Sequence, residues 1–216
     1  PNSRWYSGSG IYRDVNLWTG KDVYISHDKL RITTLSVNDD MAVIEVCAQL
    51  KNIIGHGLEA ECLIEIKKDG QKTASDTQRV VFRSEQMQTV RVQIPIEHPK
   101  KWSPKQPALY ECHITTKFDD KICDEAVSNF GIRVLALDPV RGLQINGETF
   151  KLRGTCIHHD NGVIGAETFK EAEWYRCKRL KEAGFNAIRS AHHPMSRAML
   201  DACDHIGMLV MDELTD

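Results

Sequence analysis

Apolar and polar side chains alternate with a period of two between about residues 29 and 134. The alternation is regular in residues 41–50 and again in residues 108–118. A period of two is typical of a strand with one buried face, so each segment is predicted to be a strand. The predicted buried faces carry Ala42, Ile44, Val46, Ala48 and Leu50 in the first segment, and Tyr110, Cys112, Ile114 and Phe118 in the second.

Further strands are predicted at residues 79–84 and 89–96, and Asp69-Gly70 is a typical two-residue turn between paired strands. No long segment with helical periodicity separates these strands. Several short strands of this kind predict an antiparallel β-sandwich of immunoglobulin-like size over residues 20–137. The Cys-Trp-Cys spacing of antibody domains is missing from the sequence, so the prediction concerns the architecture alone.

The pattern changes after Asp138. Residues 143–154 predict a hairpin that turns at Asn146-Gly147, with the return strand running toward Cys156. Downstream, Thr168 and Glu171 have the spacing of a capping box, which marks the start of a helix. The apolar stripe of that predicted helix carries Trp174, Cys177 and Leu180.

Glycines and a serine set the limits of the remaining elements. The first helix is predicted to end at Gly184, and residues 186–190 form a short strand. Ser196 is predicted to cap a second helix that ends at Gly207, before a strand at residues 208–214. The order of strand, helix, strand, helix, strand predicts a parallel sheet covered by helices.

Histidines and carboxylates gather where these three strands end. The first strand is followed by His158, His159 and Asp160, the second by His192 and His193, and the third by Asp212 and Glu213. The carboxyl ends of parallel strands share one edge of a sheet, where α/β proteins bind their ligands. Since no GxGxxG or GxxxxGK[ST] motif follows any of the strands, a nucleotide site is disfavoured.

Composition and charge exclude some classes of partner. The 28 basic and 30 acidic residues give a net charge of −2, without the basic excess that binding to nucleic-acid phosphates requires. No apolar run approaches the roughly 18 residues that span a bilayer, so we predict neither a nucleic-acid nor a membrane partner. The seven cysteines include no CxxC pair and are expected to be reduced thiols, which favours a cytoplasmic location; a periplasmic or secreted one stays open.

Four stretches of the sequence resemble glycoside hydrolase family 2, the group of β-galactosidases and β-glucuronidases. Residues 3–18 (SRWYSGSGIYRDVNLW) resemble the last strand of the family's N-terminal jelly roll, which would occupy residues 1–19. Residues 101–114 (KWSPKQPALYECHI) resemble a segment of its immunoglobulin-like middle domain. The other two stretches are residues 145–160 (INGETFKLRGTCIHHD), which resemble the barrel entry, and GFNAIRSAHHP with HIGMLVMDE, which resemble the second and third barrel strands.

The resemblance implies a multi-domain fragment: an immunoglobulin-like β-sandwich followed by the first three βα units of a TIM (β/α)8 barrel over residues 138–216. It also implies a retaining β-glycosidase that acts on a terminal sugar of an oligosaccharide. The family's two catalytic glutamates lie on later barrel strands, so no catalytic residue is expected in this chain, which should be inactive alone. A β-galactosidase is favoured, with a β-glucuronidase or a non-catalytic carbohydrate- or subunit-binding module as alternatives.

The resemblance also suggests roles for single residues. It implies that His158 and Asp160 contact the sugar, and on an extended strand these two would share one face while His159 points away. It implies that His192, in the family's SHYP position, binds sugar hydroxyls. His159 replaces a common Glu and His193 a common Tyr, which leaves the role of His159 open and favours a structural role for His193.

Three supporting residues complete the predicted site. The resemblance implies that Arg189 lies beneath the sugar and orders the glutamates, with Asp212 and Glu213 as its partners or supports. Metal ligands are not expected among these residues, because adjacent histidines face opposite ways on a strand. No cofactor is expected, although magnesium is possible in a longer enzyme. An unpaired edge after three barrel strands favours a homo-oligomer.

Overall fold

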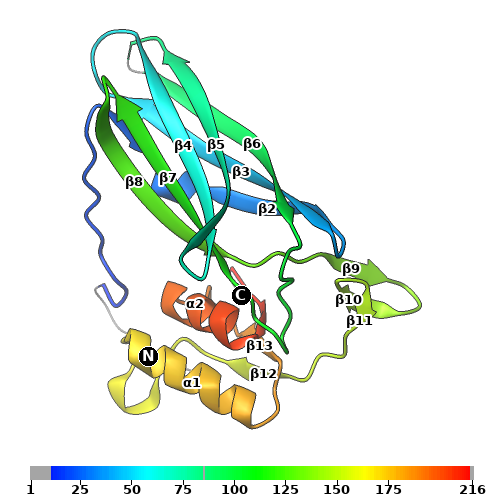
Figure 1. Ribbon diagram of the computed structural model, residues 1–216. Helices are drawn as coiled ribbons and strands as arrows, with labels where there is room; N and C mark the ends of the chain where they lie inside the picture. Colours follow the sequence, from blue (N-terminus) through cyan, green and yellow to red (C-terminus); the bar gives the residue numbers. More distant parts are fainter. Residues whose placement is uncertain (1–10, 85, 215–216) are drawn as a thin grey trace. The chain divides into compact units, whose positions relative to one another are not determined.

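The computed structural model describes residues 11–84 and 86–214 of the chain. They form two compact units (Figure 1). Residues 18–84 and 86–102 with 108–135 make up the first, and residues 11–17, 103–107 and 136–214 make up the second. The loop at 103–107, which the sequence pattern assigned to the sandwich, therefore groups with the second unit.

The first unit is a sandwich of two antiparallel sheets. In one sheet, β3 (Met41–Asn52) pairs with β6 (Met87–Glu97) on one side and with β1 (Val23–Ile25) and β2 (Arg31–Val37) on the other. The second sheet has the order β5-β4-β7-β8. Its strands are β4 (Leu58–Lys68), β5 (Gln71–Phe82), β7 (Tyr110–Phe118) and β8 (Lys121–Phe130), and a short 3-10 helix spans His27–Lys29. The predicted antiparallel sandwich is confirmed.

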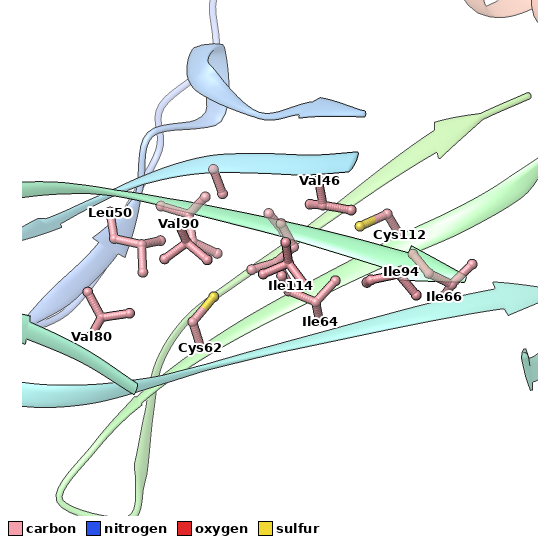
Figure 2. Packing of buried hydrophobic residues seen from close by; sticks show 14 of the residues in the cluster. Val46, Leu50, Cys62, Ile64, Ile66, Val80, Val90, Ile94, Cys112 and Ile114 are labelled. Carbon is pink, nitrogen blue, oxygen red and sulfur yellow. The ribbon is translucent and has the colours of Figure 1, made fainter. Parts of the chain in front are cut away.

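The core of the sandwich lies between the two sheets (Figure 2). The predicted inward face of β3 is fully buried, as are Ile64 of β4 and Ile114 of β7, which lie opposite each other in the strand register. Cys62 and Cys112 are part of this core, and burial raises the pKa of each thiol to about 12. All seven cysteines are free, as the odd number and the spacing predict.

Two tight turns connect the strands of the second sheet. Asp69 and Gly70 have φ angles of 52° and 79°, which is the left-handed backbone of the predicted hairpin between β4 and β5. The β7–β8 hairpin uses Asp119 and Asp120, with φ angles of 53° and 59°. Aspartate tolerates this backbone better than most residues, so a pair of them closes a turn without glycine.

The second unit contains two small sheets. The first has the order β11-β10-β9 and includes the predicted hairpin at Asn146-Gly147. The second has the order β12-β13-β14 and is parallel throughout, with α1 between its first two strands and α2 between its last two. The bounds are β9 (Leu135–Asp138), β10 (Gly142–Ile145), β11 (Glu148–Thr149), β12 (Gly154–Ile157), α1 (Lys170–Glu182), β13 (Ala187–Ser190), α2 (Arg197–Ile206) and β14 (Leu209–Met211), with a 3-10 helix at Gly162–Ile164.

Both helices bury an apolar face against the parallel sheet. The core of this unit contains Cys177, Met199 and Cys203, with Trp174, Leu180, Leu200 and Ile206 packed beside them, so the predicted stripe of Trp174, Cys177 and Leu180 faces inward. Ser196 caps α2 as predicted, since its hydroxyl oxygen accepts the amide of Met199 at 3.2 Å. The predicted strand–helix–strand order is confirmed. No helix among the described residues is long and apolar enough to cross a membrane.

Two local predictions are wrong. Thr168 does not cap α1, because its hydroxyl donates to the carbonyl of Tyr12 at 3.3 Å, and the N-cap position falls on Phe169. The return strand of the hairpin stops at Thr149 and does not reach Cys156, which belongs to the separate strand β12. For Thr168, a partner distant in sequence decides the outcome. The jelly-roll strand predicted over residues 1–19 lies partly outside the described residues, and residues 11–19 have no regular secondary structure.

Gly207 ends α2 at a point of close backbone approach. Its φ is 82°, and a Cβ there would lie 2.5 Å from the carbonyl oxygen of Pro104. Gly184 follows α1 with a φ of 89°, but a Cβ there would meet nothing within 4 Å. The two glycines share a left-handed backbone and differ in the space around them.

Gly207→Ala is therefore expected to destabilise the chain by about 3 kcal/mol, against about 1 kcal/mol for Gly184→Ala. Both variants add the cost of a left-handed alanine, and only Gly207→Ala adds the collision with Pro104. Urea unfolding followed by circular dichroism would measure the difference. Equal losses of unfolding free energy in the two variants would contradict the close approach.

Candidate functional site

The strand register of the parallel sheet brings three strand ends together. Ile157, the last residue of β12, lies opposite Ser190, the last residue of β13. On the other side of β13, Arg189 lies opposite Met211, the last residue of β14. The residues that follow each strand therefore emerge at one edge of the sheet, as the sequence predicts.

Glu213 connects two of these strand ends. Its Oε1 accepts a hydrogen bond from Nε of Arg189 at 2.6 Å, and its Oε2 accepts the backbone N–H of His192 at 2.5 Å. His192 has a left-handed backbone, with a φ of 71°, that few non-glycine residues adopt. Glu213 thus fixes both the guanidinium of Arg189 and the turn that carries His192.

Electrostatics stabilise the ionised form of this pair. The N–H of His192 and then the guanidinium of Arg189 lower the pKa of Glu213. The pKa of Arg189 is raised, first by its contact with the sulfur of Cys156 at 3.6 Å and then by Glu213. The predicted partnership of Arg189 with Glu213 is present, whereas Asp212 turns elsewhere and accepts the amide of Met195 at 2.9 Å.

The first and second strand ends meet through two histidines. The ring of His158 lies 5.5 Å from the ring of His192, between centroids, with the planes tilted by 38°. A third predicted sugar-binding residue, Asp160, is half-buried at the same strand end. The structure thus brings His158 and His192 together, and their contact with a sugar stays a prediction.

The predicted alternation of faces does not extend over His158, His159 and Asp160. Strand β12 ends at Ile157, and the chain bends at His159, so the three residues are not on an extended strand. The charge of Asp160 is near enough to His159 to raise its pKa, although burial is the larger effect and lowers that pKa overall. Alternation therefore does not decide where these side chains point, and tertiary contacts do: His158 lies against His192, whereas the buried His159 lies against His193.

The two histidines that depart from the family motif pack against each other. The rings of His159 and His193 are 4.7 Å apart, and the ring of Tyr12 lies 5.4 Å from that of His159. His159 is 94% buried, and its Nδ1 has no hydrogen-bond partner among the described residues. Nothing in the sequence predicts that His159 and His193 contact each other, whereas the structure packs their rings together.

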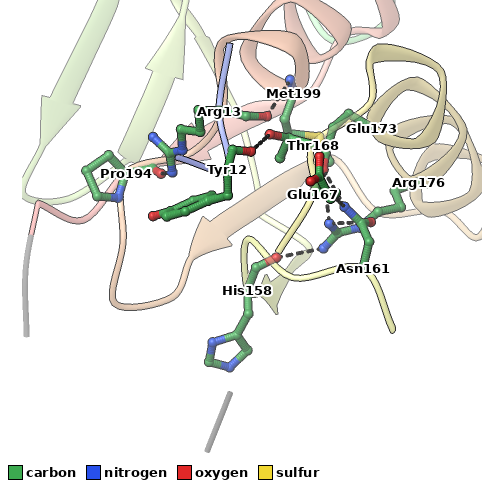
Figure 3. A network of polar contacts seen from close by, with 11 residues as sticks. Tyr12, Arg13, His158, Asn161, Glu167, Thr168, Glu173, Arg176, Pro194 and Met199 are labelled. Atoms are coloured by element: carbon green, nitrogen blue, oxygen red, sulfur yellow. Dashed lines mark hydrogen bonds and ion pairs between the residues drawn. The ribbon is translucent and has the colours of Figure 1, made fainter. Parts of the chain in front are cut away.

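Helix α1 supplies a polar network that contacts the backbone of His158 (Figure 3). Arg176 donates from Nη2 to the carbonyl of His158 at 2.7 Å and from Nη1 to Asn161 Oδ1 at 2.8 Å. Glu173 is buried and accepts from Asn161 Nδ2 at 2.8 Å and from Arg176 at 3.3 Å. These contacts fix the backbone that carries His158. The sequence alone does not predict this network; the trace that it leaves there is the opposite charges of Glu173 and Arg176, which are three residues apart on the helix.

The segment before the sandwich reaches the same strand ends. Arg13 donates to the carbonyl of Pro194, and the carbonyl of Tyr12 accepts from Thr168 (Figure 3). Ile11, Tyr12 and Arg13 line a pocket of about 460 Å³ with His193 and Pro194. Among residues 11–84 and 86–214, no group of three His, Cys, Asp or Glu side chains could hold a metal ion.

The comparisons with known proteins agree with this architecture. Residues 23–133 match the sequence profile of glycosyl hydrolases family 2, and residues 140–215 match its TIM barrel domain. The chain belongs to glycosyl hydrolases family 2. Its two units are the family's immunoglobulin-like domain and the start of its TIM barrel.

Similar proteins include enzymes named for two different sugars. The chain is 32% identical to a β-galactosidase of Bacteroides ovatus over all of its length, which is 26% of that protein. It is 28% identical to a β-glucuronidase of Bacteroides fragilis, covering 95% of the chain and 30% of the relative. A solved family 2 structure from Bacteroides cellulosilyticus superposes with a TM-score of 0.92 at 36% identity, covering all of the chain and 28% of that structure. The chain thus spans between a quarter and a third of these relatives.

Proposed function

We propose that this chain is part of a retaining β-glycosidase and that its strand-end residues bind the terminal sugar of a β-galactoside. The observation that carries the proposal is the joining of three strand ends at one edge by Glu213, Arg189 and the His158–His192 pair. Imidazole and carboxylate groups held in this way can exchange hydrogen bonds with sugar hydroxyls. Such bonds strengthen as the ring distorts toward the transition state.

The cleavage step needs groups other than Glu213. Retaining hydrolysis uses two carboxyl groups about 5–5.5 Å apart, one to attack C1 and one to protonate the leaving oxygen. Both oxygens of Glu213 already accept hydrogen bonds, and its ionised form is stabilised, which suits neither a proton donor nor a free nucleophile. By family resemblance the catalytic pair belongs to later barrel strands.

A β-glucuronide is the second candidate substrate, because relatives of both names cover nearly the whole chain. The basic groups described near the strand-end histidines already have partners, so none is placed to bind a sugar carboxylate. Arg189 is bonded to Glu213, Arg176 donates to the carbonyl of His158, and Arg13 donates to the carbonyl of Pro194. The lack of an unpaired basic group among the described strand-end residues favours a neutral terminal sugar, such as galactose, over a glucuronic acid at these strand ends.

The test uses the full-length protein that carries this chain, with 4-nitrophenyl β-galactoside, β-glucuronide and β-mannoside as substrates. We expect the highest kcat/KM for the galactoside and a product that first appears as the β-anomer. His158→Ala should lower kcat/KM about tenfold, the effect of one lost hydrogen bond to a polar ligand. His205→Ala, at an exposed position of α2, is the matched control. A higher kcat/KM for the glucuronide would contradict the proposed galactoside specificity. Wild-type kcat/KM of His158→Ala would contradict the proposed sugar-binding role of the strand-end residues.

A further inference from the structure

An aromatic pocket lies on the sandwich, among residues that the proposed catalytic function does not use. It has a volume of about 510 Å³, within the range of pockets that bind small molecules. The lining comes from the chain entering the sandwich, from β1 and its 3-10 helix, and from β8. Its principal residues are Trp18, Tyr24, Ser26, His27, Asp28 and Asp124.

Trp18 presents an exposed and oriented indole ring. The ring is stacked on His27 with centroids 3.8 Å apart and planes 20° from parallel, and Trp18 is nevertheless 64% exposed. Singly exposed aromatic side chains are common, so the ordered stack on His27 at the rim of a pocket, and not the exposure alone, indicates a ligand. Because the histidine holds one face of the indole, little conformational freedom remains to be lost when a ligand covers the other.

The backbone around the pocket is fixed by its own contacts. Asp124 accepts the amide of Ile25 at 2.8 Å through Oδ2, and its Oδ1 accepts the amide of Glu125 at 2.9 Å. The amide of Lys21 donates to the carbonyl of Cys123 at 3.1 Å. Next to it, a Cβ at Gly20 would lie 2.6 Å from Cβ of Tyr24, so the chain approaches the tyrosine as closely as a glycine allows.

Charge restricts the ligands that suit this pocket. Among the described residues that line it, the charged side chains of fixed sign are Asp28 and Asp124. Two lysines lie beside the pocket without lining it: Lys29 pairs with Asp28 at 3.2 Å, and Lys51 lies 6.0 Å from the ring of Tyr24. Carboxylates accept hydrogen bonds from hydroxyl groups and repel anions. An aromatic face beside carboxylate and hydroxyl acceptors therefore fits the apolar face and the hydroxyl edge of a neutral pyranose better than a uronic acid or a phosphate.

We propose that Trp18, His27, Tyr24, Asp28 and Asp124 form a second binding site, which holds a neutral sugar by stacking on Trp18. The site is independent of the strand-end residues and performs no chemistry. A sugar bound here anchors an oligosaccharide on the sandwich and raises its local concentration for any other site of the same protein.

The test is a titration of the full-length protein, labelled with 5-fluorotryptophan, with D-galactose, D-glucose and D-glucuronate. The fluorine resonance of Trp18 is assigned by its loss in Trp18→Phe. We expect saturable shifts of that resonance by the neutral sugars, with dissociation constants of about 1 mM, and at least tenfold weaker binding of glucuronate. Tryptophan resonances of the strand-end unit serve as an internal reference.

Variants separate this site from the proposed catalytic one. Trp18→Ala should weaken binding at least tenfold, measured by sugar-affinity electrophoresis on immobilised galactan, while hydrolysis of 4-nitrophenyl β-galactoside stays within twofold of wild type. Tyr175→Ala removes an aromatic side chain of similar exposure on α1 and should change neither property. A Trp18 resonance that does not move at about 50 mM sugar, or equal binding of glucuronate, would overturn the proposal whether or not the protein hydrolyses glycosides.

Discussion

Glu213→Gln is expected to lower the kcat/KM of the full-length enzyme about 100-fold, mostly in kcat, while the protein stays folded. The carboxylate has two acceptor oxygens, and each receives one donor, from Arg189 and from the backbone of His192. A glutamine has one acceptor oxygen, so one of these donors would face an NH2 group. The left-handed turn at His192 or the position of Arg189 must then change, and a displacement of about 1 Å near a reacting sugar can cost about 100-fold.

The measurement is steady-state kinetics on 4-nitrophenyl β-galactoside, with thermal unfolding as the check on folding. Glu182→Gln is the matched control, because Glu182 is an exposed carboxylate of the same unit whose ion pairs with Arg179 and Lys178 lie on the surface of α1. Surface pairs of this kind contribute little, so the control should keep its activity. Activity of Glu213→Gln within threefold of wild type would show that the carboxylate does not position the site.

The pH dependence of the same contact has a definite sign. The pKa of Glu213 is lowered below the ordinary value of 4.5 by the His192 amide and by Arg189. A carboxylate whose pKa is lower in the folded than in the unfolded state stabilises the folded state above its unfolded pKa, and this contribution disappears as the pH falls through the folded pKa. Glu213 is therefore expected to stay ionised, and its contact to stay intact, throughout pH 5–8.

The alternation of apolar residues was sufficient to predict the sandwich, because each strand has one face in the core and one outside. Ala42, Ile44 and Val46 are all buried, as a period of two requires. The hairpin at Asp69-Gly70 followed from its turn residues, but the one at Asp119-Asp120 did not, because aspartate pairs rarely close such turns and carry no glycine signal. Local sequence therefore predicts strands best where one face is buried, and turns best where a glycine is present.

The sequence predicts which residues reach the strand ends, but strand alternation does not determine the orientation of their side chains. Strand order alone brings His158, His192 and Glu213 to one edge, since carboxyl ends of parallel strands share an edge. Which way each side chain points depends on where a strand stops. Because β12 stops at Ile157, alternation no longer applied to His159, and its contact with His193 was decided by tertiary packing. Thr168 failed for the same reason, because Tyr12 is 156 residues away in sequence.

Ile114→Ala is expected to destabilise the chain by about 4 kcal/mol. Ile114 is completely buried on β7, opposite Ile64 of β4, in the layer where the two sheets meet (Figure 2). Removing three carbon atoms there loses their transfer free energy and leaves a cavity, which together cost about 2–5 kcal/mol for a buried isoleucine. The strands on both sides of β7 limit how far the backbone can collapse into the space, so the upper part of that range applies.

Val127→Ala on β8 is the matched control, because this valine is 60% exposed on a strand that pairs directly with β7. Its truncation should cost less than about 0.5 kcal/mol. Urea unfolding of the chain followed by circular dichroism gives both values, and the double variant Ile64→Ala with Ile114→Ala tests their coupling. Residues that share one cavity relax together, so the double variant should lose less than the sum of the single losses. Strict additivity, or a loss below about 1 kcal/mol for Ile114→Ala, would mean that β4 and β7 do not bury these side chains in a common core.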